Sequence, residues 1–338
     1  MPQYSSVLIL GARGRFGQAA ARAFAQAGWT VHAQLRPGAT GPQIAGVQWL
    51  HADPSDTATL ARHAAGADVV VQALSPQYTH KAWRVEVPRL TSAAINVARA
   101  LGATLMLPAS VYNFGEAMPT VLRADTPQEA TTFKGRMRIA SEQQIREATQ
   151  DGRMKAVVIR SGDFFGSGTG SWLDLVMAKG LKAGKLTYPG KLNVPTAWAY
   201  LPDMARTFVA VAQRRHSLPA FETLHFGGYH LTGRDWIAAL TPIAREQGWL
   251  CAGAPLRAAS LWWPLVGVAS LFVPTVAAMW EMRYLWRRPY RLANDRLIEL
   301  IGAEPQTPFP QALRAALSEL DLMQDKPAAG HASMMLQR

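Results

Sequence analysis

The chain contains a single cysteine, Cys251, among its 338 residues. One thiol excludes a disulfide within the chain and is typical of a reducing compartment. The first residues, Met-Pro-Gln-Tyr, lack the basic stretch of a signal peptide, so we expect a cytoplasmic protein. No motif surrounds Cys251, which predicts a partly buried small residue rather than a nucleophile.

Acidic residues are scarce: 23 of them face 35 lysines and arginines, for a net charge of +12. Such a balance favours an anionic partner, which is nucleic acid, a membrane surface or a phosphorylated small molecule. We expect no nucleic acid, because the sequence has no module that interleaves aromatic and basic residues. A phosphate-rich cofactor would use part of the charge. The exception to its even spread is a group of arginines near the end: Arg283, Arg287, Arg288, Arg291 and Arg296.

Several signatures of other enzyme classes are missing. The sequence has no Walker loop, no zinc cluster and no nucleophile elbow. His80, His225 and His230 do not have the spacing of metal ligands, so no metal is expected.

Charge is also missing from Ala258 to Trp280, an apolar stretch rich in tryptophan and followed by arginines. Its length resembles a membrane span. Pro264 and Pro274 divide it into two short helices, which favours a hydrophobic lid or a subunit contact, such as that of a homodimer. Peripheral membrane contact through residues 258–280 stays open as an alternative.

The most informative motif is the glycine triplet near the start. A short apolar run, Val7–Leu10, predicts a buried strand, and a helical pattern follows over Phe16–Ala27. Glycines between them allow a tight turn and close approach to a pyrophosphate at the positive end of the helix. We therefore predict dinucleotide binding. The predicted contacts in this loop are Gly11, Arg13, Gly14, Arg15, Phe16 and Gly17.

Strand-like and helical patterns alternate through the first two-thirds of the chain. The predicted strands are Val7–Leu10, Thr30–Leu35, Val47–Leu50, Asp68–Ala73, Thr104–Leu107 and Ala156–Ile159. The predicted helices between them are Phe16–Ala27, Thr57–Ala65, Val87–Leu101 and Gly135–Thr149. This alternation predicts an α/β fold, a Rossmann-type doubly wound parallel sheet.

Domain organisation follows from where the alternation loosens. We expect a dinucleotide-binding domain over residues 1–162 and a smaller, mostly helical substrate lobe over residues 163–323, with segments that return to the main sheet. Residues 324–338 are polar and are expected to form a flexible tail.

The end of the second predicted strand carries Arg36 and no carboxylate. An acidic residue here meets a free ribose diol, whereas an arginine meets a 2′-phosphate. Arg36 together with Arg13 therefore favours NADP(H) over NAD(H). Asp53 after the third strand either accepts from adenine or caps the next helix. Ala73 and Leu74, after the fourth strand, would pass under the cofactor.

These motifs resemble the short-chain dehydrogenase/reductase superfamily, in its extended and atypical branch, which includes nucleotide-sugar epimerases and dehydratases. The resemblance covers roughly residues 5–235. Besides the glycine loop it rests on three segments: Ser110-Val-Tyr-Asn-Phe-Gly115, Arg160-Ser-Gly-Asp-Phe-Phe-Gly166 and Trp198-Ala-Tyr-Leu-Pro-Asp203. It implies hydride transfer with a nicotinamide cofactor and places Asp163 and Tyr200 on the substrate side.

The catalytic pair of this family is absent. The family carries a Tyr, a Lys four residues on and a Glu four residues further; aligned on Glu142, this chain has Lys134 and Arg138 in the first two places. Tyr112 is then the candidate proton donor, with Ser110 binding the substrate oxygen. Lys134 as the acid, and Arg138 as a contact of the nicotinamide ribose, are further candidates.

Three functions follow. The first is an NAD(P)-dependent oxidoreductase or epimerase-like enzyme acting on a hydroxyl or carbonyl carbon of a small molecule, with a nucleotide sugar among the options. The second is a catalytically silent sensor or scaffold that binds NADP(H). The third, suggested by residues 258–280, is a membrane-associated enzyme for a lipid-like substrate.

Overall fold

A computed structural model describes residues 5–251 and 253–323 of the chain. The predicted tail over residues 324–338 lies outside the described residues. The core is a seven-stranded sheet in the order β3-β2-β1-β4-β5-β7-β11, and every pairing within it is parallel. Its strands are β1 (Ser6–Leu10), β2 (Thr30–Leu35), β3 (Val47–His51), β4 (Val69–Gln72), β5 (Thr104–Ser110), β7 (Lys155–Ser161) and β11 (Phe221–His225). The predicted doubly wound parallel sheet is confirmed.

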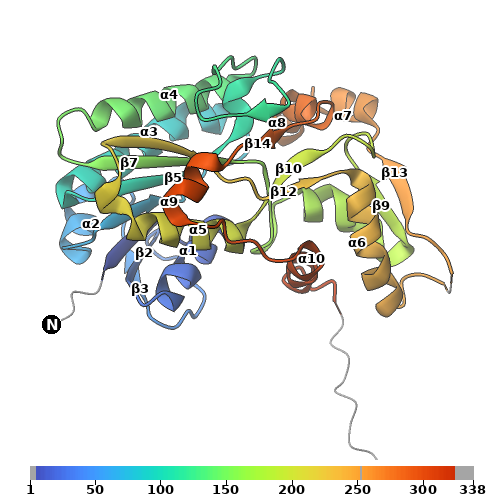
Figure 1. Ribbon diagram of the computed structural model, residues 1–338, viewed down its shortest axis with the longest axis horizontal. Helices are drawn as coiled ribbons and strands as arrows, with labels where there is room; N and C mark the ends of the chain where they lie inside the picture. Colours follow the sequence, from blue (N-terminus) through green and yellow to red (C-terminus); the bar gives the residue numbers. More distant parts are fainter. Residues whose placement is uncertain (1–4, 252, 324–338) are drawn as a thin grey trace, which may run out of the picture.

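Helices cover both faces of this sheet, as Figure 1 shows. Alternate residues of β1 point to opposite faces, as the period of a strand requires. Val7 and Ile9 pack in one apolar cluster against helices α1 (Arg15–Gln26) and α5 (Leu201–Gln213). Leu8 and Leu10 pack in the other cluster, against α2 (Thr57–His63), α3 (His80–Leu101) and α4 (Phe133–Ala148).

One helix begins well before its predicted start, and one suggested helix cap is wrong. The helix predicted over Val87–Leu101 begins seven residues earlier, at His80, with Thr79 as its N-cap and Pro88 inside it. Pro88 hid the first turns because proline in a helix interior removes a hydrogen bond. The capping role suggested for Asp53 is wrong: α2 begins at Thr57 with Asp56 as its cap, while Asp53 accepts the N–H of Ser55 at 2.8 Å.

The second lobe is built from short strands and helices (Figure 1). Small sheets pair β10 with β8 and β12, β9 with β13, and β6 with β14. These strands are β6 (Val121–Leu122), β8 (Asp163–Phe165), β9 (Lys185–Tyr188), β10 (Thr196–Tyr200), β12 (Tyr229–Leu231), β13 (Arg257–Ser260) and β14 (Arg291–Leu292). An aromatic cluster that includes Trp198, Trp236 and Trp286 fills the lobe. Between its segments the chain returns to the main sheet through α5 and β11.

The remaining helices complete the fold. They are η1 (Val111–Phe114), η2 (Leu173–Met177), η3 (Ala178–Ala183), η4 (Arg215–Ser217), α6 (Gly233–Glu246), α7 (Trp263–Ala269), α8 (Pro274–Glu281), η5 (Met282–Trp286), α9 (Asp295–Ile301) and α10 (Phe309–Ser318). Helices α7 and α8 are the two short helices predicted for the uncharged stretch. Across residues 5–251 and 253–323, no helix is both long and apolar enough to cross a bilayer. Cys251, expected to be partly buried, is exposed because it lies in the loop after α6.

Candidate active site

The glycine loop lies where the strand order reverses, between β1 and β4. Gly11 has a φ of +76°, and a Cβ there would come within 2.9 Å of the main chain of Leu74. A Cβ on Gly17 would come within 2.4 Å of the carbonyl oxygen of Gly11. Larger residues are therefore excluded at both places, and the strand, the turn and the helix pack closely.

Gly14 is the N-cap of α1, and no side chain caps this helix. Its first turn also holds no acidic residue. The N-terminal amides of a helix are anion-binding groups when nothing in the protein occupies them. The loop thus fits a pyrophosphate, with Ala73 and Leu74 lining the turn as the sequence places them: Ala73 N–H donates to Leu10 at 2.9 Å.

A buried glutamine fixes the loop, and the sequence reasoning missed it. Gln34 on β2 is 1% exposed. Its Oε1 accepts the N–H of Gly11 at 2.9 Å, and its Nε2 donates to the carbonyl of Ala52 at 2.7 Å. The available signal was a glutamine next to the end of the second predicted strand.

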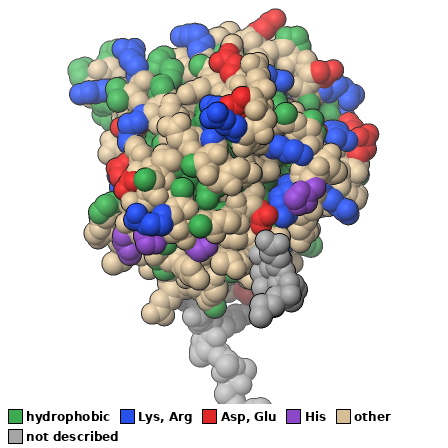
Figure 2. Space-filling model, turned by 90° about the vertical axis from the view of Figure 1, so that its left-hand side faces the viewer, with side chains coloured by type: hydrophobic (Ala, Val, Ile, Leu, Met, Phe, Trp, Pro, Cys, Tyr) green, Lys and Arg blue, Asp and Glu red, His purple; other side chains and the backbone are tan. Residues whose placement is uncertain are grey.

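Arg13 and Arg36 are exposed at the ends of β1 and β2. Neither guanidinium has a hydrogen bond or ion pair among residues 5–251 and 253–323, so both can meet a ligand. Asp53 lies at the end of β3, 60% exposed and 3.8 Å from Arg89. On the face drawn in Figure 2, basic side chains are scattered among acidic and apolar ones.

Arg15 has a different environment from the one predicted. Its guanidinium donates to the carbonyls of Gly166 at 2.7 Å and Gly170 at 3.3 Å. Burial lowers the pKa of Arg15 to about 10, although Asp174 and Glu319 oppose the shift. In this structure Arg15 therefore joins the first turn of α1 to the loop of the second lobe.

Ser110 is the last residue of β5 and Tyr112 lies in η1, so both lie at the carboxyl end of the sheet. Tyr112 Oη lies 3.4 Å from Tyr78 Oη, and one of the two hydroxyls donates. Ser110 Oγ is buried and has no hydrogen-bond partner in the part of the chain that the structure describes. A buried hydroxyl without a partner is costly, which indicates a place for a ligand oxygen.

Burial raises the pKa of Tyr112 to about 12, and the charge of Asp163 acts in the same direction. The hydrogen bond from Tyr78 and the charge of Arg138 oppose this rise. Arg138 thus stands close enough to Tyr112 to favour its phenolate. Its guanidinium lies 4.8 Å from the ring centre of Trp83, and its Nε has no partner within the described residues.

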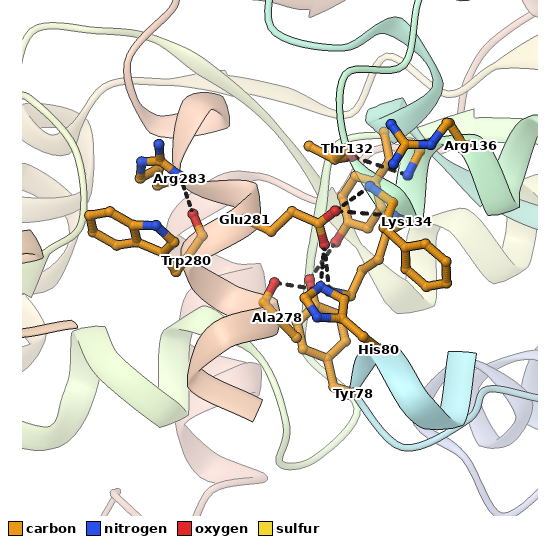
Figure 3. Close-up of polar contacts among 12 residues, drawn as sticks. Tyr78, His80, Thr132, Lys134, Arg136, Ala278, Trp280, Glu281 and Arg283 are labelled. Atoms are coloured by element: carbon orange, nitrogen blue, oxygen red, sulfur yellow. Dashed lines mark hydrogen bonds and ion pairs between the residues drawn. The ribbon is translucent and has the colours of Figure 1, made fainter. Parts of the chain in front are cut away.

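Lys134, in the place of the family's tyrosine, is 0% exposed. Its Nζ donates to the carbonyl of Ala278 at 3.0 Å and to Glu281 Oε2 at 3.2 Å, and it lies 4.4 Å from the ring centre of Tyr78. Burial lowers the pKa of Lys134, while Glu281 opposes the shift. Figure 3 shows that the lysine points to α8, which comes from the far end of the chain.

Glu281 is the second residue that the sequence reasoning missed. Its carboxylate contacts Lys134, His80 Nε2 at 2.8 Å and the main-chain N–H groups of Phe133 and Lys134 (Figure 3). Burial opposes its ionisation, but the hydrogen bond with His80 and the charge of Lys134 outweigh this and lower its pKa. Its sequence signal was only that it is the first charge after the uncharged stretch.

Glu142, the residue on which the resemblance was aligned, forms a buried ion pair with Arg160 at 2.6 Å. Asn113 Nδ2 donates to the same carboxylate at 2.9 Å. The pair joins α4 to β7 and η1, so it fixes the segments that carry Tyr112 and Asp163. A buried pair of this kind needs both partners.

Asp163 begins β8 directly after β7, opposite Trp198 of β10. Its carboxyl group has no hydrogen bond or ion pair among the described residues. Burial raises the pKa of Asp163 to about 7. Its charge in turn raises the pKa of five tyrosines: Tyr78, Tyr112, Tyr188, Tyr284 and Tyr290. The resemblance put Asp163 on the substrate side but gave no hint that it titrates near neutral pH.

Comparisons with known proteins agree with this geometry. The chain is similar in structure to the UDP-Glc/GlcNAc 4-epimerase of Campylobacter jejuni, with a TM-score of 0.69 and 14% identity over 93% of this chain and 98% of that one. It is also similar to WbmH of Bordetella bronchiseptica, solved with NAD+, with a TM-score of 0.67 and 18% identity over 94% and 98% of the two chains.

A third similar structure is the UDP-glucuronic acid 4-epimerase of Bacillus cereus in complex with NAD, with a TM-score of 0.68 and 14% identity over 94% and 98%. At these identities the structures show the shared fold. A search of the curated proteins found no match. The model of the NAD dependent epimerase/dehydratase family matches residues 7–227, which is nearly two thirds of the sequence. The chain belongs to the NAD dependent epimerase/dehydratase family.

Proposed function

We propose that this protein is an NADP(H)-dependent enzyme that transfers a hydride to or from a carbon bearing a hydroxyl or carbonyl group of a small molecule. A bound nicotinamide would supply the hydride donor or acceptor. The observation that carries the proposal is Asp163, a buried carboxyl group without a partner among the described residues, whose charge acts on the Tyr112 hydroxyl. A group whose pKa lies near the working pH is suited to exchange protons.

Each nearby side chain has a role in this proposal. The hydroxyls of Ser110 and Tyr112 hold the substrate oxygen. During reduction Tyr112 donates its proton to that oxygen as the carbon accepts the hydride, and Asp163 restores the proton to the phenol. Arg138 stabilises the transient phenolate by its charge. Lys134 acts as a positioning residue, since its ammonium group is already bound by Glu281 and Ala278.

NADP(H) is favoured over NAD(H) by the two unpaired arginines. Arg13 and Arg36 follow neighbouring strands, and a 2′-phosphate dianion suits two guanidinium groups. The test is a fluorescence titration with NADPH and NADH. We expect Arg36→Gln to weaken the affinity for NADPH at least tenfold and to leave the affinity for NADH almost unchanged. Arg22 is an exposed arginine on α1, and Arg22→Gln should change neither affinity.

Activity is tested in two ways. NADPH absorbance is followed with a panel of carbonyl compounds, and UDP-sugars, which the names of two similar structures carry, are tested for epimerisation and for reduction of NADP+. Tyr112→Phe should lower kcat by about two orders of magnitude without changing NADPH affinity. Asp163→Asn should abolish the change in rate near pH 7. Full activity of both variants would refute these roles.

The alternative function is a silent NADP(H) sensor. It is favoured by Lys134, which replaces the family's tyrosine and whose ammonium group already donates to Ala278 and Glu281. The sensor would be supported over the enzyme by tight NADPH binding together with two negative results. These are no turnover of any compound in the panel and no epimerisation of UDP-sugars.

A further inference from the structure

Helices α7 and α8 and the turn between them form a hairpin, residues 262–281, that exposes apolar side chains. The described residues contain nine exposed large hydrophobic side chains, and six of them lie between positions 262 and 273. The six are Trp262, Leu265, Val268, Leu271, Phe272 and Val273. At the turn, Leu271 is 78% exposed and Phe272 is 79% exposed. A concentration of this kind marks an interaction surface.

Hydrogen bonds and ring contacts attach the base of the hairpin to the rest of the protein. Trp263 Nε1 donates to the carbonyl of Pro189 at 2.7 Å. Its ring also packs against Trp280 of α8, with centroids 6.0 Å apart. At the other end Glu281 binds Lys134 and His80 of the nucleotide-binding half (Figure 3). The apolar tip therefore projects from a fixed support.

Arginines precede and follow this apolar surface along the chain. No charged residue occurs between Ala258 and Trp280, and arginines flank both ends. Arg257, Arg287 and Arg288 are exposed, while Arg283 stacks on Trp280 at 4.3 Å from its ring centre. An apolar surface with tryptophans and a basic border is typical of segments that lie in the interface of an anionic bilayer.

We propose that this hairpin docks the protein on an anionic membrane surface. Leu271, Phe272 and Val273 enter the boundary between headgroups and acyl chains, and the flanking arginines contact lipid phosphates. Helices of seven and eight residues extend about 10–12 Å each, which suits the interface and not a span.

A lipid surface fits the charges better than a second copy of the chain does. A two-fold contact through this surface would bring the same patch of both copies together. It would therefore oppose two sets of arginines, with no acid in the hairpin before Glu281 to compensate them. Lipid phosphate, in contrast, neutralises the border.

The test is co-sedimentation of the full chain with vesicles of phosphatidylcholine alone or with 30% phosphatidylserine. We expect binding to the anionic vesicles that weakens with salt. Leu271→Ser/Phe272→Ser should weaken it about tenfold or more, because each substitution removes a large apolar side chain that the membrane would bury. Val85→Ser/Ile298→Ser, exposed apolar residues outside the hairpin, is the matched control and should bind like the wild type. Arg287→Gln/Arg288→Gln should remove the preference for phosphatidylserine.

Wild-type protein that stays in the supernatant with both vesicles would overturn the proposal. Equal binding by the hairpin variant and the control would also overturn it. Light scattering in solution provides the third arm: a dimer that Leu271→Ser/Phe272→Ser dissociates would assign the surface to a second copy instead. NADPH titration of each variant separates this proposal from the enzymatic one, since the hairpin variants should keep full cofactor affinity.

Discussion

Replacing Asp163 by asparagine should change how stability depends on pH, and the size of the change follows from the structure. Burial raises the pKa of this carboxyl group from 3.8 to about 7. In the folded chain Asp163 therefore keeps its proton between pH 4 and 7, whereas in the unfolded chain it loses it. Because the folded state then binds more protons, the free energy of unfolding falls as pH rises through this window.

The magnitude is bounded by the shift. About three pKa units at about 1.4 kcal/mol each give a loss of up to about 4 kcal/mol between pH 4 and pH 7. Asparagine has nearly the shape of the protonated acid and does not ionise. We therefore expect Asp163→Asn to match the wild type near pH 4 and to exceed its stability increasingly toward pH 7.5.

The assay is urea unfolding of both proteins at several pH values from 4 to 8.5, with the difference in free energy plotted against pH. Groups that both proteins share cancel in this difference. Asp295→Asn, which removes a carboxyl group at an exposed position, is measured in parallel as the control. A flat curve for Asp163→Asn would refute the buried, unpaired carboxyl group and the proton exchange built on it.

Three further outcomes are expected. Gly17→Ala should abolish NADPH binding in a fluorescence titration, since its Cβ would meet the main chain of Gly11 and Ala12; unchanged affinity would contradict the predicted cradle. Glu281→Ala should lower the free energy of unfolding by about 3 kcal/mol in urea titrations, because it leaves the buried Lys134 ammonium unpaired, and Lys134→Met in the same chain should restore most of the loss. His225→Gln should remove a loss of up to about 3 kcal/mol as pH falls from 6.5 to 4, because burial and Arg160 lower the pKa of His225 to about 4; equal acid sensitivity of variant and wild type would exclude this.

The fold could be predicted because its signals are local. The strand Thr30–Leu35 and the others in the main sheet are short apolar runs between turns, and a fully buried parallel strand needs nothing else. The glycine loop is also local: three glycines, one strand and one helix within a dozen residues. Errors came where a local rule was overridden, as at Pro88, which lies inside α3 because the surrounding packing holds the helix.

The candidate site could be predicted only in part, because its electrostatics are not local. Ser110 and Tyr112 follow a predicted strand, so their place at the sheet edge could be foreseen. Lys134, in contrast, was compared with a tyrosine by alignment, and nothing near it in sequence tells that Glu281 binds it. A carboxylate almost 150 residues away decides whether this lysine is free to donate a proton.

The site therefore still holds a phenol and a cation, as the family's catalytic helix does, but here the two groups come from different elements. The family's tyrosine and lysine stand on one helix, four residues apart. Here the cation is Arg138 on α4, while the phenol beside it is Tyr112, which comes from η1 at the end of β5. The place left by the family's tyrosine holds Lys134, whose charge Glu281 neutralises. In the proposed mechanism the phenol approaches from another element and is influenced by the charge of Asp163, so the proposed acid–base chemistry does not depend on the motif that the sequence has lost.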